Sequence, residues 1–205
     1  MRITAQEKDA TRERIVEAAL ALFRQQGFEA TTTREIARAA EIATGTLFNY
    51  FPNKEDILGQ VAGRALCKAR AAFAKQDAAA DLAAADIEED LFALVAAELR
   101  QLKPLRKLMD GLLETVLCPL AASKGDGAED SLRVAHLEIV ASIARKHGVP
   151  EMTPLALQIY WALYTGVLSF WASDSSSKQE ATLALLDQSL HMFSAWLRGT
   201  AGKPQ

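Results

Sequence analysis

Residues 11–58 read TRERIVEAALALFRQQGFEATTTREIARAAEIATGTLFNYFPNKEDIL, and this stretch decides the fold. Its first part repeats apolar residues at the spacing of one helix face: Ile15, Ala18, Ala19, Leu22 and Phe23. Gly27 follows, and glycine readily takes the left-handed conformation found just after a helix. The pattern therefore predicts a first helix that buries one face and ends near Gly27.

A second, shorter helix is expected to begin directly after Thr32. The stretch Thr32-Thr33-Arg34-Glu35 is a capping box, because the Thr32 hydroxyl can accept the amide of residue 35 while the Glu35 side chain reaches back. This helix is expected to run to about residue 40.

A tight turn at residues 41–43 then leads into a third helix over about residues 44–50, which Pro52 stops. Two short helices joined by a three-residue turn, behind a longer helix, predict a helix-turn-helix head. In such heads the second helix of the pair lies in the major groove of DNA. On spacing alone, an ordinary three-helix bundle remains an alternative.

The rest of the chain is also predicted to be helical. Capping residues, prolines and glycines divide it into helices over about residues 53–76, 86–103, 105–120, 128–147, 154–172 and 177–198. The predicted fold class is all-α with about nine helices. An N-terminal three-helix helix-turn-helix head, residues 1–56, precedes a C-terminal helical ligand-binding and dimerisation body, residues 57–205.

Charge and hydropathy narrow the class of protein. The 205-residue chain has a net charge of −3, so any contact with DNA must come from a local surface rather than from a global basic field. The N-terminus lacks the apolar core of a signal peptide. The most apolar stretch, residues 155–172, is interrupted by Gln158 and rich in aromatics, so we expect a buried helix. These features predict a cytoplasmic protein with no membrane partner.

No catalytic pattern is found in the sequence. It contains neither a G-x-S-x-G motif nor a glycine-rich phosphate loop. The histidines, His136, His147 and His191, fall on different predicted helices, and the two cysteines have no zinc spacing. We therefore expect no enzyme, no metal site and no cofactor. Two alternatives stay open: a small-molecule enzyme or carrier built on a helical bundle, and a structural dimer whose head has lost DNA binding.

The head resembles the TetR/AcrR family of bacterial transcriptional repressors. The matching elements are Ile-x-x-Ala-Ala-x-x-Leu-Phe from Ile15, Gly-Phe-x-x-Thr-Thr from Gly27, Ile-Ala at Ile36, and Gly-Thr-Leu-Phe-x-Tyr-Phe-x-Asn-Lys-Glu from Gly45. The body matches the family only in layout. The resemblance implies a regulator that binds a palindromic double-stranded DNA operator as a homodimer. A small apolar or amphipathic effector would release it.

The resemblance also implies which residues contact DNA. Residues at the start of the second helix would meet phosphates, those of the third helix would meet bases and phosphates, and a lysine would meet a phosphate at the start of the fourth helix. These are Thr32, Thr33, Arg34, Thr44, Gly45, Thr46, Phe48, Asn49, Tyr50 and Lys54. The chain departs from the family in four places. It has Glu41 where the family often has Gly, Ala43 and Thr44 where Ser and Lys are commoner, and Phe48 where the family has Tyr. We therefore expect a distinct operator and modest affinity.

Aromatic and apolar residues of the body predict an effector pocket. The candidates are Met109, Leu113, Leu117, His136, Tyr160, Trp161 and Tyr164. Glu114 and His136 would orient the effector if they face inward. Plain core remains an alternative for each residue, because periodicity does not separate pocket lining from core.

The last two helices carry more apolar surface than one subunit can bury. The helix over residues 154–172 is apolar on nearly all faces, and the helix over 177–198 adds a second apolar stripe. A soluble monomer rarely exposes such surface, so we expect these helices to form the homodimer interface.

Overall fold

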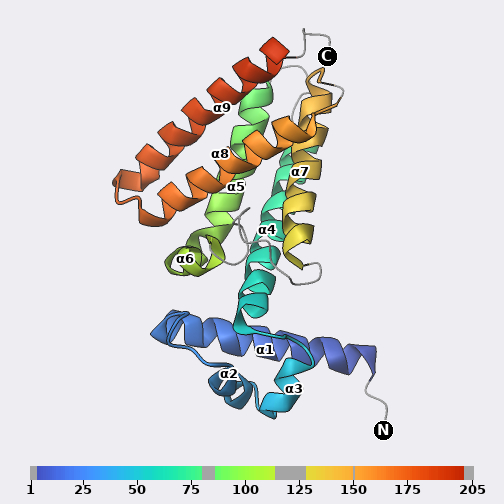
Figure 1. The fold of residues 1–205 in the computed structure, drawn as a ribbon, viewed down its shortest axis with the longest axis vertical. Coiled ribbons are helices and arrows are strands. Elements are labelled where there is room, and N and C mark those ends of the chain that lie inside the picture. The colour runs from blue at the N-terminus through green and yellow to red at the C-terminus, as the bar shows by residue number, and fades with distance from the viewer. Residues whose placement is uncertain (1–3, 80–85, 114–127, 150, 201–205) are drawn as a thin grey trace.

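The computed structural model describes residues 4–79, 86–113, 128–149 and 151–200. Within these ranges the chain is helical and contains no strand, which confirms the predicted all-α fold. Figure 1 shows three helices at the base of the molecule and a larger helical body above them. The base consists of α1 (Ala5–Gln26), α2 (Thr33–Ala39) and α3 (Thr44–Phe48).

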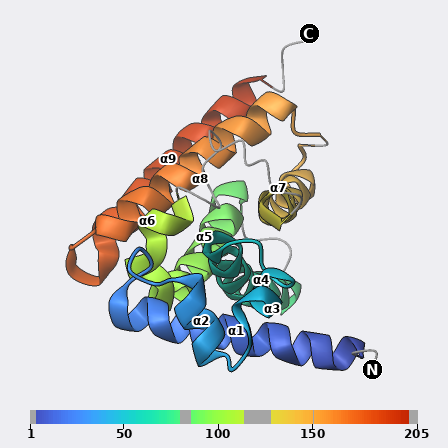
Figure 2. The same ribbon diagram turned by 60° about the horizontal axis from the view of Figure 1, so that its bottom comes forward.

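The body is built on α4, which rises from the base into its centre (Figure 1). Its helices are α4 (Lys54–Ala79), α5 (Ile87–Leu102), α6 (Met109–Leu112), α7 (Ala128–Lys146), α8 (Pro154–Ser173) and α9 (Glu180–Thr200). Helix α4 packs along α5, and α9 lies beside both α5 and α8. Figures 1 and 2 both show α8 and α9 side by side.

One predicted helix differs from expectation at its start. We expected an α-helix from residue 105, but the chain forms a 3-10 helix over Lys103–Leu108 before α6 begins. Pro104 lies in the first turn of the 3-10 helix, where its missing N–H costs nothing. The part of the expected helix beyond residue 113 lies outside the described residues.

The turn between α2 and α3 fixes the geometry of the head. The Ile42 amide donates to the Ala37 carbonyl at 2.9 Å, and the Glu41 amide donates to the Arg38 carbonyl at 3.1 Å. These two bonds define a Schellman motif, whose central residue is left-handed. Glu41 occupies that position with φ 55°. This left-handed backbone conformation is strained for a residue with a side chain but not for glycine.

Apolar side chains of α1, α2 and α3 belong to one buried core. Ile15, Ala19 and Phe23 form the buried face of α1, as the sequence predicted. Ile36 of α2 and Leu47 of α3 are fully buried against it. The head is therefore a packed unit that holds α3 in a fixed orientation.

Helix α4 begins within the residues assigned to the head and continues into the body, as the helix predicted over about residues 53–76 does. Asn53 begins it, since the Asn53 side chain accepts the Asp56 amide at 2.7 Å. Further along, Arg64 of α4 forms two hydrogen bonds of 2.6 Å with the Glu13 carboxylate on α1. One helix thus contacts the head and enters the body.

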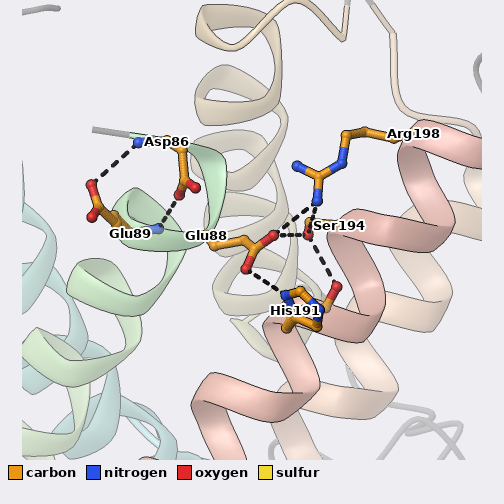
Figure 3. A network of polar contacts seen from close by, with 6 residues as sticks. All are labelled: Asp86, Glu88, Glu89, His191, Ser194 and Arg198. Carbon is orange, nitrogen blue, oxygen red and sulfur yellow. Dashed lines mark hydrogen bonds and ion pairs between the residues drawn. The ribbon is translucent and has the colours of Figure 1, made fainter. Parts of the chain in front are cut away.

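A polar network joins the start of α5 to α9 (Figure 3). The Glu88 carboxylate accepts hydrogen bonds from Ser194 and from Arg198, the latter at 3.0 Å, and lies 3.1 Å from His191 Nδ1. The hydrogen bond from Ser194 is the largest cause that lowers the pKa of Glu88, so the carboxylate stays ionised. The network fixes α9, whose other side faces away from the body.

Helix α8 is the one described helix long and apolar enough to cross a membrane. Its aromatic residues Tyr160, Trp161, Tyr164 and Trp171 are each at most 3% exposed in the body. The burial predicted for residues 155–172 therefore holds for these side chains, whereas Leu155 and Phe170 are 62% and 42% exposed. A helix at the core of a folded body meets the same criteria of length and hydropathy.

We predict that Glu41→Gly stabilises the head, because glycine removes the steric cost of the left-handed conformation. The expected gain in the free energy of unfolding is about 1 kcal/mol. Ala39→Gly, two residues earlier at the last residue of α2, should lower stability by a similar ~1 kcal/mol. Chemical denaturation of both variants checks this. Destabilisation by Glu41→Gly would contradict the assigned turn.

Candidate functional site

The structure places six of the residues predicted to contact DNA on α3 and directly after it. Gly45, Phe48 and Asn49 are exposed, and Thr44, Thr46 and Tyr50 are half-buried. Phe48 is 48% exposed, so it lies at the surface of the head and not in its core. By contrast, Leu47 and Phe51 are buried and belong to the core.

At the start of α2, the capping box predicted from the sequence is present. The Thr32 amide and hydroxyl both donate to Glu35 Oε2, at 2.9 and 2.7 Å, and these bonds lower the pKa of Glu35. The Thr32 hydroxyl is thus engaged within the protein. Half-buried Thr33 and exposed Arg34 are the other side chains predicted to meet phosphate at this helix end.

Lys54 has a positioning role that the sequence did not reveal. Its ammonium group donates to the Phe28 carbonyl at 2.9 Å and lies 4.3 Å from the centre of the Phe28 ring. It ties the start of α4 to the loop between α1 and α2. Its predicted contact with a DNA phosphate stays a prediction.

The head carries little net charge. Residues 1–56 contain eight lysines and arginines against nine aspartates and glutamates. Glu41 adds an exposed acid in the turn before α3. Any DNA contact by this head therefore depends on individual hydrogen-bond donors and cations rather than on a basic surface.

In the body, the structure gathers four of the predicted pocket residues into one cluster. His136 of α7 stacks on Tyr160 and Tyr164 of α8, with ring centres 5.6 and 4.2 Å apart, and Trp161 packs against both His136 and Tyr164. All four side chains are at most 3% exposed. We call His136, Tyr160, Trp161 and Tyr164, together with Glu98 and Arg70, the central cluster.

The remaining pocket candidates are placed differently. Met109 is buried on α6, and Leu113 beyond it is half-buried. Leu117 and Glu114 lie outside the described residues. The predicted polar orienter His136 faces inward, whereas the position of Glu114 is not described.

Sequence reasoning missed the two charged residues of the central cluster. Glu98 of α5 is fully buried, and its Oε1 accepts a hydrogen bond from Arg70 Nε of α4 at 3.1 Å. His136 Nδ1 lies 3.1 Å from the same oxygen, and His136 Nε2 lies 3.2 Å from the Tyr160 hydroxyl. The sequence does contain a signal for the burial of Glu98. This residue lies seven positions after Leu91 and four after Leu94, so it falls on the apolar stripe of its helix.

The charges of the cluster compensate for burial. Burial alone would raise the pKa of Glu98, but the positive charges of His136 and Arg70, with the hydrogen bond from His136, hold it below the ordinary 4.5. The ion pair therefore stabilises the fold at neutral pH. This stabilisation is lost as the pH falls from the ordinary glutamate pKa of the unfolded chain towards the lower pKa of Glu98 in the folded protein.

Three polar atoms of the cluster have no hydrogen-bond partner among the described residues. They are Glu98 Oε2, Trp161 Nε1 and the Tyr164 hydroxyl. The Tyr164 hydroxyl lies near Glu98 but falls short of hydrogen-bond geometry; burial first, and the carboxylate charge second, raise its pKa well above the ordinary value. Unpartnered buried polar atoms are costly, so they mark a place where a bound molecule can gain interactions.

A hollow of about 280 Å³ opens elsewhere, between α1, α4 and the end of α5. Its lining combines apolar residues with four charged ones: Glu17, Arg24, Arg64 and Lys68. Arg64 is already paired with Glu13. None of the predicted pocket residues lines this hollow, so it is separate from the central cluster.

We predict that Arg70→Ala lowers the free energy of unfolding by about 3 kcal/mol or more, because it leaves the buried Glu98 carboxylate without its cation. Arg64→Ala is the matched control on the same helix. Its partner Glu13 is exposed, so the loss should stay below about 1 kcal/mol. Urea denaturation at neutral pH measures both. Equal, small losses would contradict a charged central cluster.

Comparison with known proteins places the head in a family. Residues 15–61 match the family model described as bacterial regulatory proteins, tetR family. The HTH-type transcriptional regulator AcrR of Shigella flexneri is 40% identical over 60 residues, which cover 29% of this chain and 28% of AcrR. The HTH-type transcriptional repressor KstR of Mycolicibacterium smegmatis is 43% identical over 53 residues, 26% of each chain. The match thus spans about a quarter of these relatives.

A solved structure extends the similarity to the body. The TetR-family transcriptional repressor FadR of Thermus thermophilus, solved in complex with lauroyl-CoA, is 25% identical with a TM-score of 0.68. The similarity covers 89% of this chain and 92% of FadR. These relatives are transcriptional regulators and not enzymes. The head therefore matches the tetR family of bacterial regulatory proteins over residues 15–61, and the chain as a whole has a fold similar to that of a TetR-family repressor.

Proposed function

We propose that the protein is a cytoplasmic, dimeric transcriptional repressor that binds a palindromic operator and is released by a small effector. The observation that carries this proposal is the exposed α3, with Gly45 and Phe48 at its surface, on a head that matches the family model. Residues 1–56 would read DNA, and residues 57–205 would bind the effector and the second subunit.

In the proposed complex, α3 lies in the major groove. Thr44, Gly45 and Thr46 meet bases and phosphates, and the exposed Phe48 ring packs on a thymine methyl group or a sugar. Thr33 and Arg34 meet the phosphate backbone at the start of α2. Because the head is nearly neutral, we expect it to make few phosphate contacts. Its affinity for DNA should then fall only gradually as the salt concentration rises.

The proposed dimer forms through α8 and α9. Seven large apolar side chains are exposed among the described residues, and five of them lie on these two helices: Leu155, Phe170, Leu183, Leu185 and Met192. A second copy would cover them in a four-helix interface. Two-fold symmetry of such a dimer would match a palindromic operator.

Effector binding in the body would act on the head through α4. The complex of Thermus thermophilus FadR with lauroyl-CoA supports a small-molecule ligand for this fold. A ligand shifts the protein between two states only by its differential affinity for them. Helix α4 is continuous from the head into the central cluster, so a shift at Arg70 would displace the recognition helices.

We predict that Thr46→Ala weakens operator binding about 10-fold, because it removes a hydroxyl from the DNA-facing side of α3. Fluorescence anisotropy with labelled operator DNA measures the affinity. Ser142→Ala, which removes an exposed hydroxyl from α7 in the body, is the control and should bind as the parent does. If Thr46→Ala also binds as the parent does, α3 is not the recognition helix.

We predict that Leu185→Asp converts the dimer into monomers at micromolar concentration, because it places a charge in the apolar α8–α9 interface. Sedimentation velocity measures the mass. Val134→Asp, on an apolar residue of α7 that is also exposed, should leave the dimer intact. A parent protein that sediments as a monomer would refute the interface.

A further inference from the structure

The hollow between α1, α4 and the end of α5 lies where the head meets the body, and we call it the junction hollow. Its lining comes from residues 16–24 of α1, residues 61–68 of α4, and residues 101–105 at the end of α5 and in the 3-10 helix. Figure 1 shows α2 and α3 on the opposite side of α1 from the body. The junction hollow is therefore on the body side of α1, away from the helix proposed to read DNA.

Most of the lining of the junction hollow is apolar. Its volume of about 280 Å³ is close to the lower end of the range for small-molecule sites, ~300–1,000 Å³. A hydrocarbon group that enters such a site releases water from its own surface and from the lining. Six of the eleven lining residues are apolar: Val16, Leu20, Val61, Ala65, Pro104 and Leu105.

The charged part of the lining favours an anion. Arg24 of α1 and Lys68 of α4 have no hydrogen-bond or ion-pair partner among the described residues, whereas Arg64 is paired with Glu13. The one acid in the lining, Glu17, lies two turns before Arg24, about 10 Å along α1. Because the hollow is small, an anion inside it lies within about one Debye length of these side chains, ~8 Å at physiological ionic strength. Two free cations attract that anion and one carboxylate repels it.

From this lining we propose that the junction hollow binds a small amphipathic anion. Its hydrocarbon part packs on the apolar residues, and the positive charges of Arg24 and Lys68 stabilise its anionic group. The site is separate from the central cluster, and binding there does not depend on any other part of the account.

The regulatory part of the proposal rests on the proposed function. An anion in the junction hollow contacts α1 of the head and the 3-10 helix of the body together, so its affinity depends on how the head is placed against the body. Binding free energies are coupled in both directions. Occupation of the hollow therefore changes the affinity of the head for its operator.

The test of the site uses three probes: octanoate, octylammonium and acetate. Octylammonium has the same hydrocarbon character with the opposite charge, and acetate has the same anionic group without the long chain. Calorimetric titration of the full chain, without DNA, gives each affinity. We expect octanoate to bind at least ~10-fold more tightly than either of the others, because only octanoate offers both features of the lining.

Variants of the lining locate the bound octanoate. Arg24→Gln and Lys68→Gln each remove one free cation and should weaken octanoate binding by ~3-fold, as expected for an exposed charge. Ala65→Phe fills part of the hollow from a half-buried position and should weaken binding by ~10-fold. The matched controls Lys8→Gln and Lys75→Gln remove exposed charges from the same two helices outside the lining, and should bind octanoate as the parent does. Thermal melting confirms that each variant is folded.

The regulatory part is tested by fluorescence anisotropy with labelled operator DNA, with and without saturating octanoate. We expect octanoate to change the operator affinity of the parent by at least ~3-fold, a coupling at the lower end of those found between two sites. The same octanoate concentration should leave the operator affinity of Ala65→Phe unchanged.

The outcomes separate the two levels of the proposal. The site is refuted if the parent does not bind octanoate, binds octylammonium as tightly, or shares its octanoate affinity with Ala65→Phe and both cation variants. If octanoate binds as expected but operator affinity is unchanged, the site stands and its regulatory role fails. If the chain binds no DNA at all while octanoate binds, the proposed function fails and the site remains.

Discussion

The buried ion pair between Arg70 and Glu98 is the interaction on which the body is organised. Removing two charges from water is costly, and the cost is offset only where geometry and further hydrogen bonds are good. Here Arg70 Nε contacts Glu98 Oε1 at 3.1 Å, a second nitrogen of Arg70 donates to the Leu132 carbonyl at 3.2 Å, and His136 Nδ1 lies 3.1 Å from Glu98 Oε1. Helices α4, α5 and α7 are thereby held in one relative position, and the aromatic rings of α8 pack on the result.

The same helix that supplies Arg70 also positions the head. Lys54 at its start holds the loop before α2, and Arg64 two turns before Arg70 holds α1 through Glu13. These contacts therefore restrict movement of the head relative to the body. This arrangement suits a protein in which a change at a buried site must alter the spacing of two recognition helices, because rigid elements transmit small displacements without absorbing them.

Much of the fold could be predicted from local chemistry. The capping box at Thr32, the asparagine cap of α4 and the apolar face of α1 each have a physical signature within a few residues, and the structure contains all three. Contacts between distant segments had no such signature. The tie between Lys54 and the Phe28 carbonyl joins residues 26 apart, and the pair Arg70–Glu98 joins residues 28 apart, so sequence spacing alone did not reveal either. A buried glutamate also contradicts the usual preference of acids for the surface, which is why Glu98 was overlooked in favour of Glu114.

The central claim is that this head reads DNA as part of a symmetric dimer. The most direct test is selection of genomic DNA fragments by the purified full-length protein at moderate salt, followed by sequencing of the retained fragments. The account predicts enrichment of one palindromic sequence whose half-sites lie on one face of the duplex, with retention that declines as salt rises. Absence of enrichment, or retention of fragments without a shared two-fold symmetric sequence, would contradict it.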